Sequence, residues 1–126
     1  MLTIPTGATV QSAFLYWAGS GNSADTTVSL DGAPVTASRV FDADFDATEG
    51  YFSGFADVTA AVTAKGSGTY TLTDLTVDSG GPFASFSTVM ATWGLVVIYE
   101  DPAITVGSQI NVYDGFELLL NNPNFP

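Results

Sequence analysis

The run Leu95–Tyr99 limits what this chain can fold into more than any other stretch. All of its residues are apolar, most are β-branched or aromatic, and Gly94 and Pro102 bound the run. Such a short apolar run is typical of a strand rather than a helix, and proline ends it because proline has no N–H to donate to a neighbouring strand. Since apolar and polar residues do not alternate, both faces are expected to be covered. The run therefore predicts a central strand in a β-protein built of two layers.

The segment Val10–Trp17 is the predicted neighbour of that strand, because it also carries bulky side chains on both faces. A hairpin is predicted next along the chain. Thr26–Leu30 alternates polar and apolar residues, Asp31-Gly32 is a typical tight-turn pair, and Val35–Phe41 forms the returning strand.

A short helix is predicted after residue 57. Asp57 is a good N-cap, Val58, Ala61 and Val62 recur at helical spacing, and Gly66 ends the helix. Further strands are predicted at 41–46, 69–77 and 109–113, with an extended segment at 83–91 and a last apolar run at 116–120. About eight strands and one short helical turn predict an all-β fold. The expected architecture is a two-layer antiparallel β-sandwich, jelly-roll-like, in a single domain over residues 1–126.

Charge and composition exclude several classes of function. The net charge is −11 and the only cations are Arg39 and Lys65, so nucleic acid and anionic membrane surfaces are excluded as partners. Cysteine and histidine are absent, which excludes disulfides, Cys/His metal sites and histidine-based catalysis. No apolar run approaches the ~20 residues of a membrane-spanning helix. The chain starts without the features of a signal peptide, so an exported protein would carry it as a mature or excised piece.

Acidic residues form the sharpest local pattern. Asp42, Asp44 and Asp46 share one face of a predicted strand, and Glu49 follows just beyond. Carboxylate oxygens suit a hard cation, so these residues are candidate ligands of a Ca²⁺ ion, the one cofactor considered. The alternative is a solvated acidic face with no ion bound.

Aromatic residues offer a second candidate site. Tyr51 and Phe52 lie between the acidic strand and the predicted helix, where exposed rings could stack on sugars. The alternative for both is packing in the core or in a turn. Glu100, Asp101 and Glu117 are the only candidate acids for a glycosidase, and neighbours on a strand point to opposite faces. No catalytic residue is assigned, and the chain is predicted not to be an enzyme.

Several segments together resemble a known kind of module. Val10–Gly19 matches A-x-L-Y-W-A-G, Tyr51–Val62 matches F-A-D-V-T, and Trp93–Phe116 matches W-x-L-V-V-I-Y-E-D-P followed by Y-D-G-F. With the hairpin at 28–35 and the segment 66–72, their order and spacing resemble β-sandwich modules of large secreted and cell-surface bacterial and archaeal proteins. The hairpin and the D-V-T turn are also similar to galactose-binding-like jelly rolls.

This resemblance implies a non-catalytic structural or adhesive module of an extracellular or cell-surface protein. Relatives continue beyond the last apolar run, which implies a domain that lacks or exchanges a terminal strand and self-assembles by strand addition. The expected partners are other copies of the chain or other surface proteins. The alternative is a calcium-stabilised carbohydrate-binding module, with glycans as partners.

Overall fold

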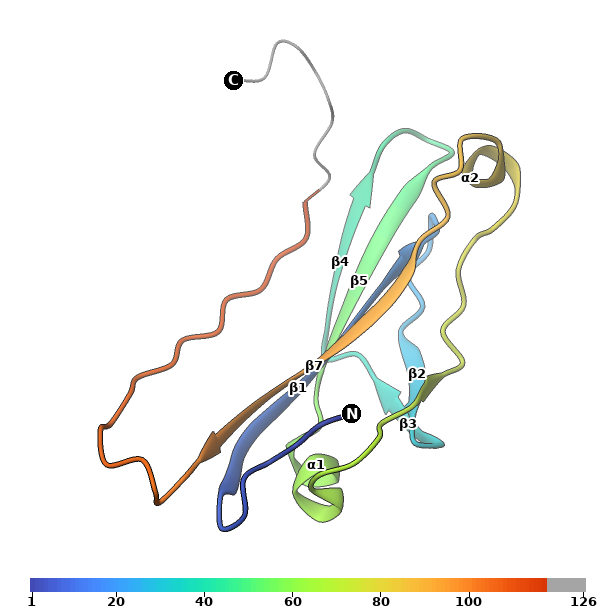
Figure 1. The fold of residues 1–126 in the computed structure, drawn as a ribbon. Coiled ribbons are helices and arrows are strands. Elements are labelled where there is room, and N and C mark those ends of the chain that lie inside the picture. The colour runs from blue at the N-terminus through green and yellow to red at the C-terminus, as the bar shows by residue number, and fades with distance from the viewer. Residues whose placement is uncertain (118–126) are drawn as a thin grey trace.

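The structure, a computed structural model, describes residues 1–117 of the chain (Figure 1). Its elements follow the order β1 (Thr9–Ser20), β2 (Thr27–Leu30), β3 (Ala33–Thr36), β4 (Arg39–Asp44), β5 (Gly50–Asp57), α1 (Thr59–Lys65), β6 (Leu72–Thr73), α2 (Gly81–Ser85) and β7 (Ala91–Glu100). Residues 118–126, which include the predicted apolar Leu118–Leu120, lie outside the described part.

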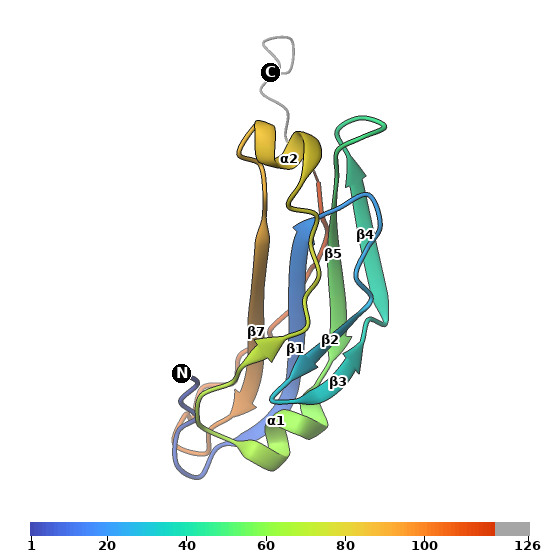
Figure 2. The ribbon, with the colours of Figure 1, turned by 90° about the vertical axis from the view of Figure 1, so that its right-hand side faces the viewer.

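The strands form two antiparallel sheets, which confirms the predicted all-β sandwich. One sheet has four strands in the order β4-β5-β1-β7, and the other has three in the order β3-β2-β6. Figure 2 shows the smaller sheet and α1 lying across one face of the larger one. The larger sheet therefore has a core face, covered by these elements, and an outer face.

The core forms because alternate residues of β1 point toward the smaller sheet. Ala13, Leu15 and Trp17 are buried on this face, and they meet buried side chains from β5, β2 and α1. The other core members are Val28, Leu30, Phe52, Ala56, Val58, Val62 and Tyr70.

A tryptophan–glycine contact sets the pairing of β1 with β5. Trp17 lies opposite Gly54 in the register of the two strands. A Cβ added to Gly54 would lie 2.3 Å from the Trp17 ring, so only glycine leaves room for the indole. The indole N–H donates to the Asp25 carbonyl at 2.9 Å, which ties β1 to the segment that leads into β2.

The predicted hairpin turn and helix are confirmed. Asp31 and Gly32 have φ angles of 52° and 80°, the left-handed pair that a two-residue hairpin turn requires. Helix α1 buries Val62 and ends at Gly66, whose φ is 70°. Asp57 lies one residue before the N-cap and accepts a hydrogen bond from the Thr59 N–H at 2.9 Å.

The central position predicted for the 95–99 run is wrong. Strand β7 pairs with β1 as expected, with Leu95 opposite Leu15, but it lies at the edge of the four-stranded sheet. Trp93, Val96 and Tyr99 are each 39% exposed. Bulk on both faces arises because the outer face is also apolar, so this pattern does not locate a strand within its sheet.

Other predicted elements differ from the structure. The returning strand of the hairpin ends at Thr36, and Arg39 begins β4 in the other sheet. Only Leu72–Thr73 of the predicted strand 69–77 is paired, and the predicted extended segment 83–91 begins inside α2. The predicted strand at 109–113 is unpaired among the described residues. In each case the local sequence pattern predicts that a segment is extended or polar. Whether the segment pairs depends on whether the fold places another strand next to it.

Two glycines of the large sheet give a matched test of this packing. Gly54→Ala should destabilise the protein by about 1–3 kcal/mol, because the added methyl overlaps the Trp17 ring. Gly94→Ala, where an added Cβ meets nothing within 4 Å, should change the free energy of unfolding by less than about 0.5 kcal/mol. Urea unfolding of both variants measures the difference, and equal losses would contradict the proposed role of Gly54.

Candidate functional site

The outer face of the four-stranded sheet carries a cluster of aromatic rings. Phe14 and Tyr16 of β1 point away from the core, and their rings lie 5.5 and 5.2 Å from that of Phe55 on β5. The guanidinium of Arg39 lies 4.2 Å from the centre of the Phe55 ring. Val96 of β7 is the registered partner of Phe14, so the apolar surface continues to the edge strand. We call Phe14, Tyr16, Phe55 and Val96 the outer apolar face.

Residues 103–117 form an extended segment after β7, here called the arm. Its even-numbered residues are mostly apolar: Ile104, Val106, Ile110 and Val112 are 41% to 75% exposed, and Ser108 interrupts the row. Its odd-numbered residues are mostly small or polar, apart from Tyr113. This alternation is that of a strand with one apolar face. Figure 1 shows the arm leaving the lower end of β7 and running back on the side of the large sheet that faces away from β2 and β3.

The arm contacts the sandwich through an ion pair. Both Nε and an Nη of Arg39 donate to the same oxygen of Asp114, and the Nε distance is 3.2 Å. Burial raises the pKa of Tyr16, and the negative charge of Asp114 raises it further. The arm therefore passes over the outer apolar face near the middle of the sheet.

The arm lacks the backbone bonding of a strand. Within residues 1–117, its one backbone hydrogen bond joins the Ile104 N–H to the Asp101 carbonyl at 3.0 Å, closing a turn. The far edge of β7 is likewise unpaired in the described chain. The described chain therefore has an open strand edge, at β7, and an exposed segment of strand-like pattern that follows this strand. Neither was expected at this place, because the sequence predicted a covered strand at 95–99 and a paired one at 109–113.

The predicted metal ligands are not gathered around one point. Asp42 and Asp44 lie on exposed positions of the edge strand β4. Asp46 lies in the following turn, where its Oδ1 accepts hydrogen bonds from the Thr48 N–H, the Thr48 hydroxyl and the Glu49 N–H at 2.6–3.0 Å. These bonds, the Thr48 hydroxyl first, lower the pKa of Asp46.

Glu49 is only 6% exposed, and it accepts a hydrogen bond from the Thr88 hydroxyl at 3.2 Å. No group of three carboxylates in residues 1–117 is arranged to hold a metal ion. Two of the four candidate ligands thus have structural partners, and calcium binding stays a prediction.

The predicted aromatic site is not exposed. Phe52 is fully buried in the core, which agrees with the packing alternative and not with an exposed ring. Tyr51 is half-buried, its ring meets that of Phe83 edge-on at 5.9 Å, and its hydroxyl donates to the Thr88 carbonyl at 3.3 Å. Both residues pack within the fold, since strand β5 alternates and places its even-numbered residues in the core.

A small cavity of about 210 Å³ opens near the end of β1. It is lined by Ser20, Asp25 and Asp78 among others, and its lining includes no aromatic ring. The carboxylate of Asp25 is already used, because its two oxygens accept hydrogen bonds from the Thr27 and Thr76 N–H groups at 3.1 and 2.7 Å. The cavity therefore offers little for stacking a sugar.

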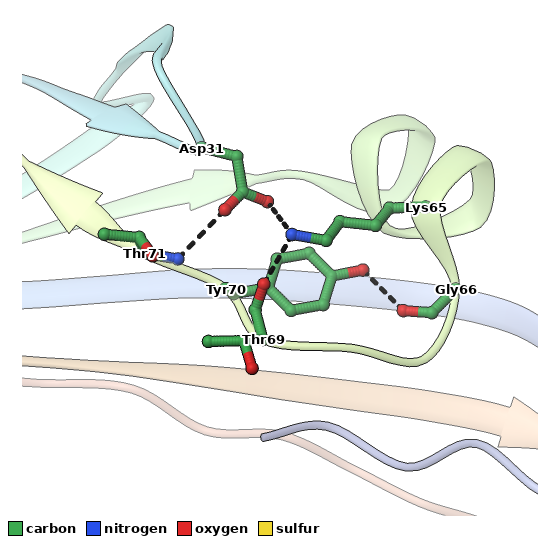
Figure 3. A network of polar contacts seen from close by, with 6 residues as sticks. All are labelled: Asp31, Lys65, Gly66, Thr69, Tyr70 and Thr71. Carbon is green, nitrogen blue, oxygen red and sulfur yellow. Dashed lines mark hydrogen bonds and ion pairs between the residues drawn. The ribbon is translucent and has the colours of Figure 1, made fainter.

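Lys65, the second cationic residue of the chain, also takes part in a network of polar contacts within the fold (Figure 3). Lys65 donates to Asp31 at 2.6 Å and to the Thr69 carbonyl, and its Nζ lies 4.4 Å from the centre of the Tyr70 ring. The other oxygen of Asp31 accepts a hydrogen bond from the Thr71 N–H at 3.0 Å. This network ties the β2–β3 turn to α1 and β6. Arg39 and Lys65 thus each pair with a carboxylate of the chain itself.

Comparison with protein-family models, curated proteins and solved structures finds no match to this chain. The described fold defines its class as an all-β protein of two antiparallel sheets. No helix within residues 1–117 has the length and apolar character needed to cross a membrane.

Three carboxylates make stability depend on pH. Hydrogen bonds from Lys65, Thr48 and Thr59 lower the pKa values of Asp31, Asp46 and Asp57 below their ordinary value of 3.8. A lowered folded-state pKa contributes stability that is present above the ordinary value and lost as pH falls through the folded value. Stability should therefore decline below about pH 4.

Urea unfolding at a series of pH values measures this decline. Asp46→Asn should remove part of it, whereas Asp42→Asn changes an exposed carboxylate and serves as the control. A decline that is the same in both variants and in the unchanged protein would contradict the role of Asp46.

Proposed function

We propose that this chain is a non-catalytic structural or adhesive module of an extracellular or cell-surface protein, which attaches to neighbouring protein by β-strand addition. The observation that carries the proposal is that, within residues 1–117, the outer edge of β7 is unpaired and the arm that follows it exposes apolar side chains. Strand addition satisfies the backbone N–H and C=O groups of an open edge and buries alternate side chains at the same time.

The energetics favour an added strand at this edge. Folded proteins protect open strand edges with lysine, proline or bulges, because such edges pair with other chains. Strand β7 has no lysine or proline along Ala91–Glu100, and its one irregularity of pairing lies near its end, opposite Val10–Ser12. Burying an exposed valine or isoleucine contributes up to about 1.5–3 kcal/mol. Covering β7 and the arm together would therefore stabilise the module appreciably.

The extracellular setting is proposed from composition and resemblance. The chain has few charged residues and no cysteine, and its polar surface is mostly Thr, Ser, Asn and Gly. The motifs in β1, β5 and β7 resemble those of secreted and cell-surface modules. Glu100 and Glu117, the candidate catalytic acids, lie at exposed positions at the end of β7 and in the arm, and Glu100 accepts a hydrogen bond from Gln11 at 3.3 Å. The carbohydrate-binding alternative has less support, because Phe52 is in the core.

A generic strand peptide tests the proposed function. A soluble peptide of four Thr-Val repeats with a lysine at each end should bind the full chain and slow amide hydrogen exchange along β7. The matched control has the same composition but groups its threonines apart from its valines, so it has the same charge without the alternation. Protection of β7 by only the alternating peptide is the expected result. Equal binding of both peptides, or protection that spares β7, would contradict strand addition at this edge.

A further inference from the structure

The arm and the β7 edge match in length and in chemistry. Strand β7 spans ten residues, Ala91–Glu100. Residues 104–113 of the arm give an equal length of extended chain, in which four of the five even-numbered residues are apolar. Along the edge of β7, Trp93 lies opposite the buried Trp17 and Val96 lies opposite Phe14. A strand added here would therefore place its apolar row against apolar side chains of the sheet.

The turn after β7 directs the arm away from its own edge. Asp101 to Ile104 form a turn closed by one backbone hydrogen bond, with Pro102 and Ala103 at its centre. Two-residue hairpins need a positive φ at the first central position, and proline holds φ near −65°. Ala103 is also absent from the residues with positive φ. The turn is therefore not of a hairpin type, and the arm diverges from β7 instead of pairing back along it.

The distribution of charge leaves these two surfaces neutral. Residues 1–24, 79–99 and 102–113 contain no charged side chain, so β1, β7 as far as Tyr99 and most of the arm carry none. Eleven of the fifteen charged residues lie between Asp25 and Asp78. A second copy of a molecule of charge −11 can approach with least repulsion along this neutral side, and a basic partner would find no carboxylate along residues 91–99.

We propose that the partner is a second copy of this chain, whose arm adds as a strand to the β7 edge of the first. This inference rests on the proposed function and names its partner. Because the contact surfaces are uncharged, the net negative charges of the two molecules still repel each other. Salt screens this repulsion, so it should strengthen the association, whereas salt would weaken an interface made of ion pairs.

Sedimentation of the full chain over a range of concentrations tests the proposal. Dimers or larger species should form with rising concentration. The association should be about tenfold tighter at 300 mM than at 10 mM salt, because the screening length falls well below the size of the protein. A particle that stays monomeric at the highest concentrations, or an association weakened by salt, overturns the proposal.

Two arm variants with the same added charge locate the contact. Val106→Asp, in the apolar row, should weaken association at least about tenfold, the cost of one buried charge being well above 1.4 kcal/mol. Gln109→Asp, in the opposite row, should change it less than about threefold, since that side chain stays in solvent. The arm makes no strand pairing with the sandwich, so circular dichroism should show both variants folded. Equal loss of association in the two variants would contradict the proposal.

An edge variant completes the test. Gly94 has open space for a side chain, so Gly94→Lys should fold and block the edge, because lysine on an edge strand opposes pairing. Val106→Asp and Gly94→Lys should each be monomeric, while their mixture should form a complex from the intact arm of one and the intact edge of the other. A mixture that stays monomeric contradicts the exchange of arms.

Failure of this inference differs from failure of the proposed function. If the Thr-Val peptide protects β7 but the full chain never self-associates, strand addition stands and a second copy is not the partner. If neither occurs, both are wrong.

Discussion

The packing of Trp17 against Gly54 is the contact on which the rest of the structure depends. It places the largest core side chain between the two sheets, fixes the register of β1 with β5, and ties β1 to the smaller sheet through Asp25. Because β1 is thereby paired on one side with β5, it has one free side left, and β7 takes it. The strand that carries Trp17, β1, therefore lies inside the sheet, between β5 and β7.

The edge position of β7 follows from that arrangement, and so does the character of the candidate site. A strand rich in apolar residues lies where nothing in the described chain covers its outer edge, and the arm that follows is turned aside by Pro102. Residues 91–99 of the edge strand and residues 103–113 of the arm carry no charged side chain in a molecule that is otherwise strongly acidic. Within residues 1–117 the large sheet therefore has two edge strands, a largely neutral one at β7 and an acidic one at β4.

The predicted site residues show how far pattern alone can reach. The alternation at residues 41–44 is correct, but Asp46 and Glu49 belong to a turn in which their carboxylates bind backbone N–H or hydroxyl groups. Phe52 and Tyr51 alternate on β5, so one of them had to enter the core, and only the register with β1 shows which one. The sequence predicted a strand at residues 109–113 of the arm. Its lack of a partner was not recognisable, because pairing is a property of distant segments.

The sequence by itself determined the local features of this protein: the β class, the hairpin turn at Asp31-Gly32, the helix ended by Gly66, and the pairing of the 95–99 run with the strand at 10–17. These follow from backbone preferences and from side-chain periodicity, which act over a few residues. Only the tertiary structure decided which strand lies at the centre, which carboxylates are used internally, and where an edge stays open. Those outcomes depend on contacts between residues far apart in the chain, since a strand with two apolar faces suits the centre and the edge of this sheet equally well.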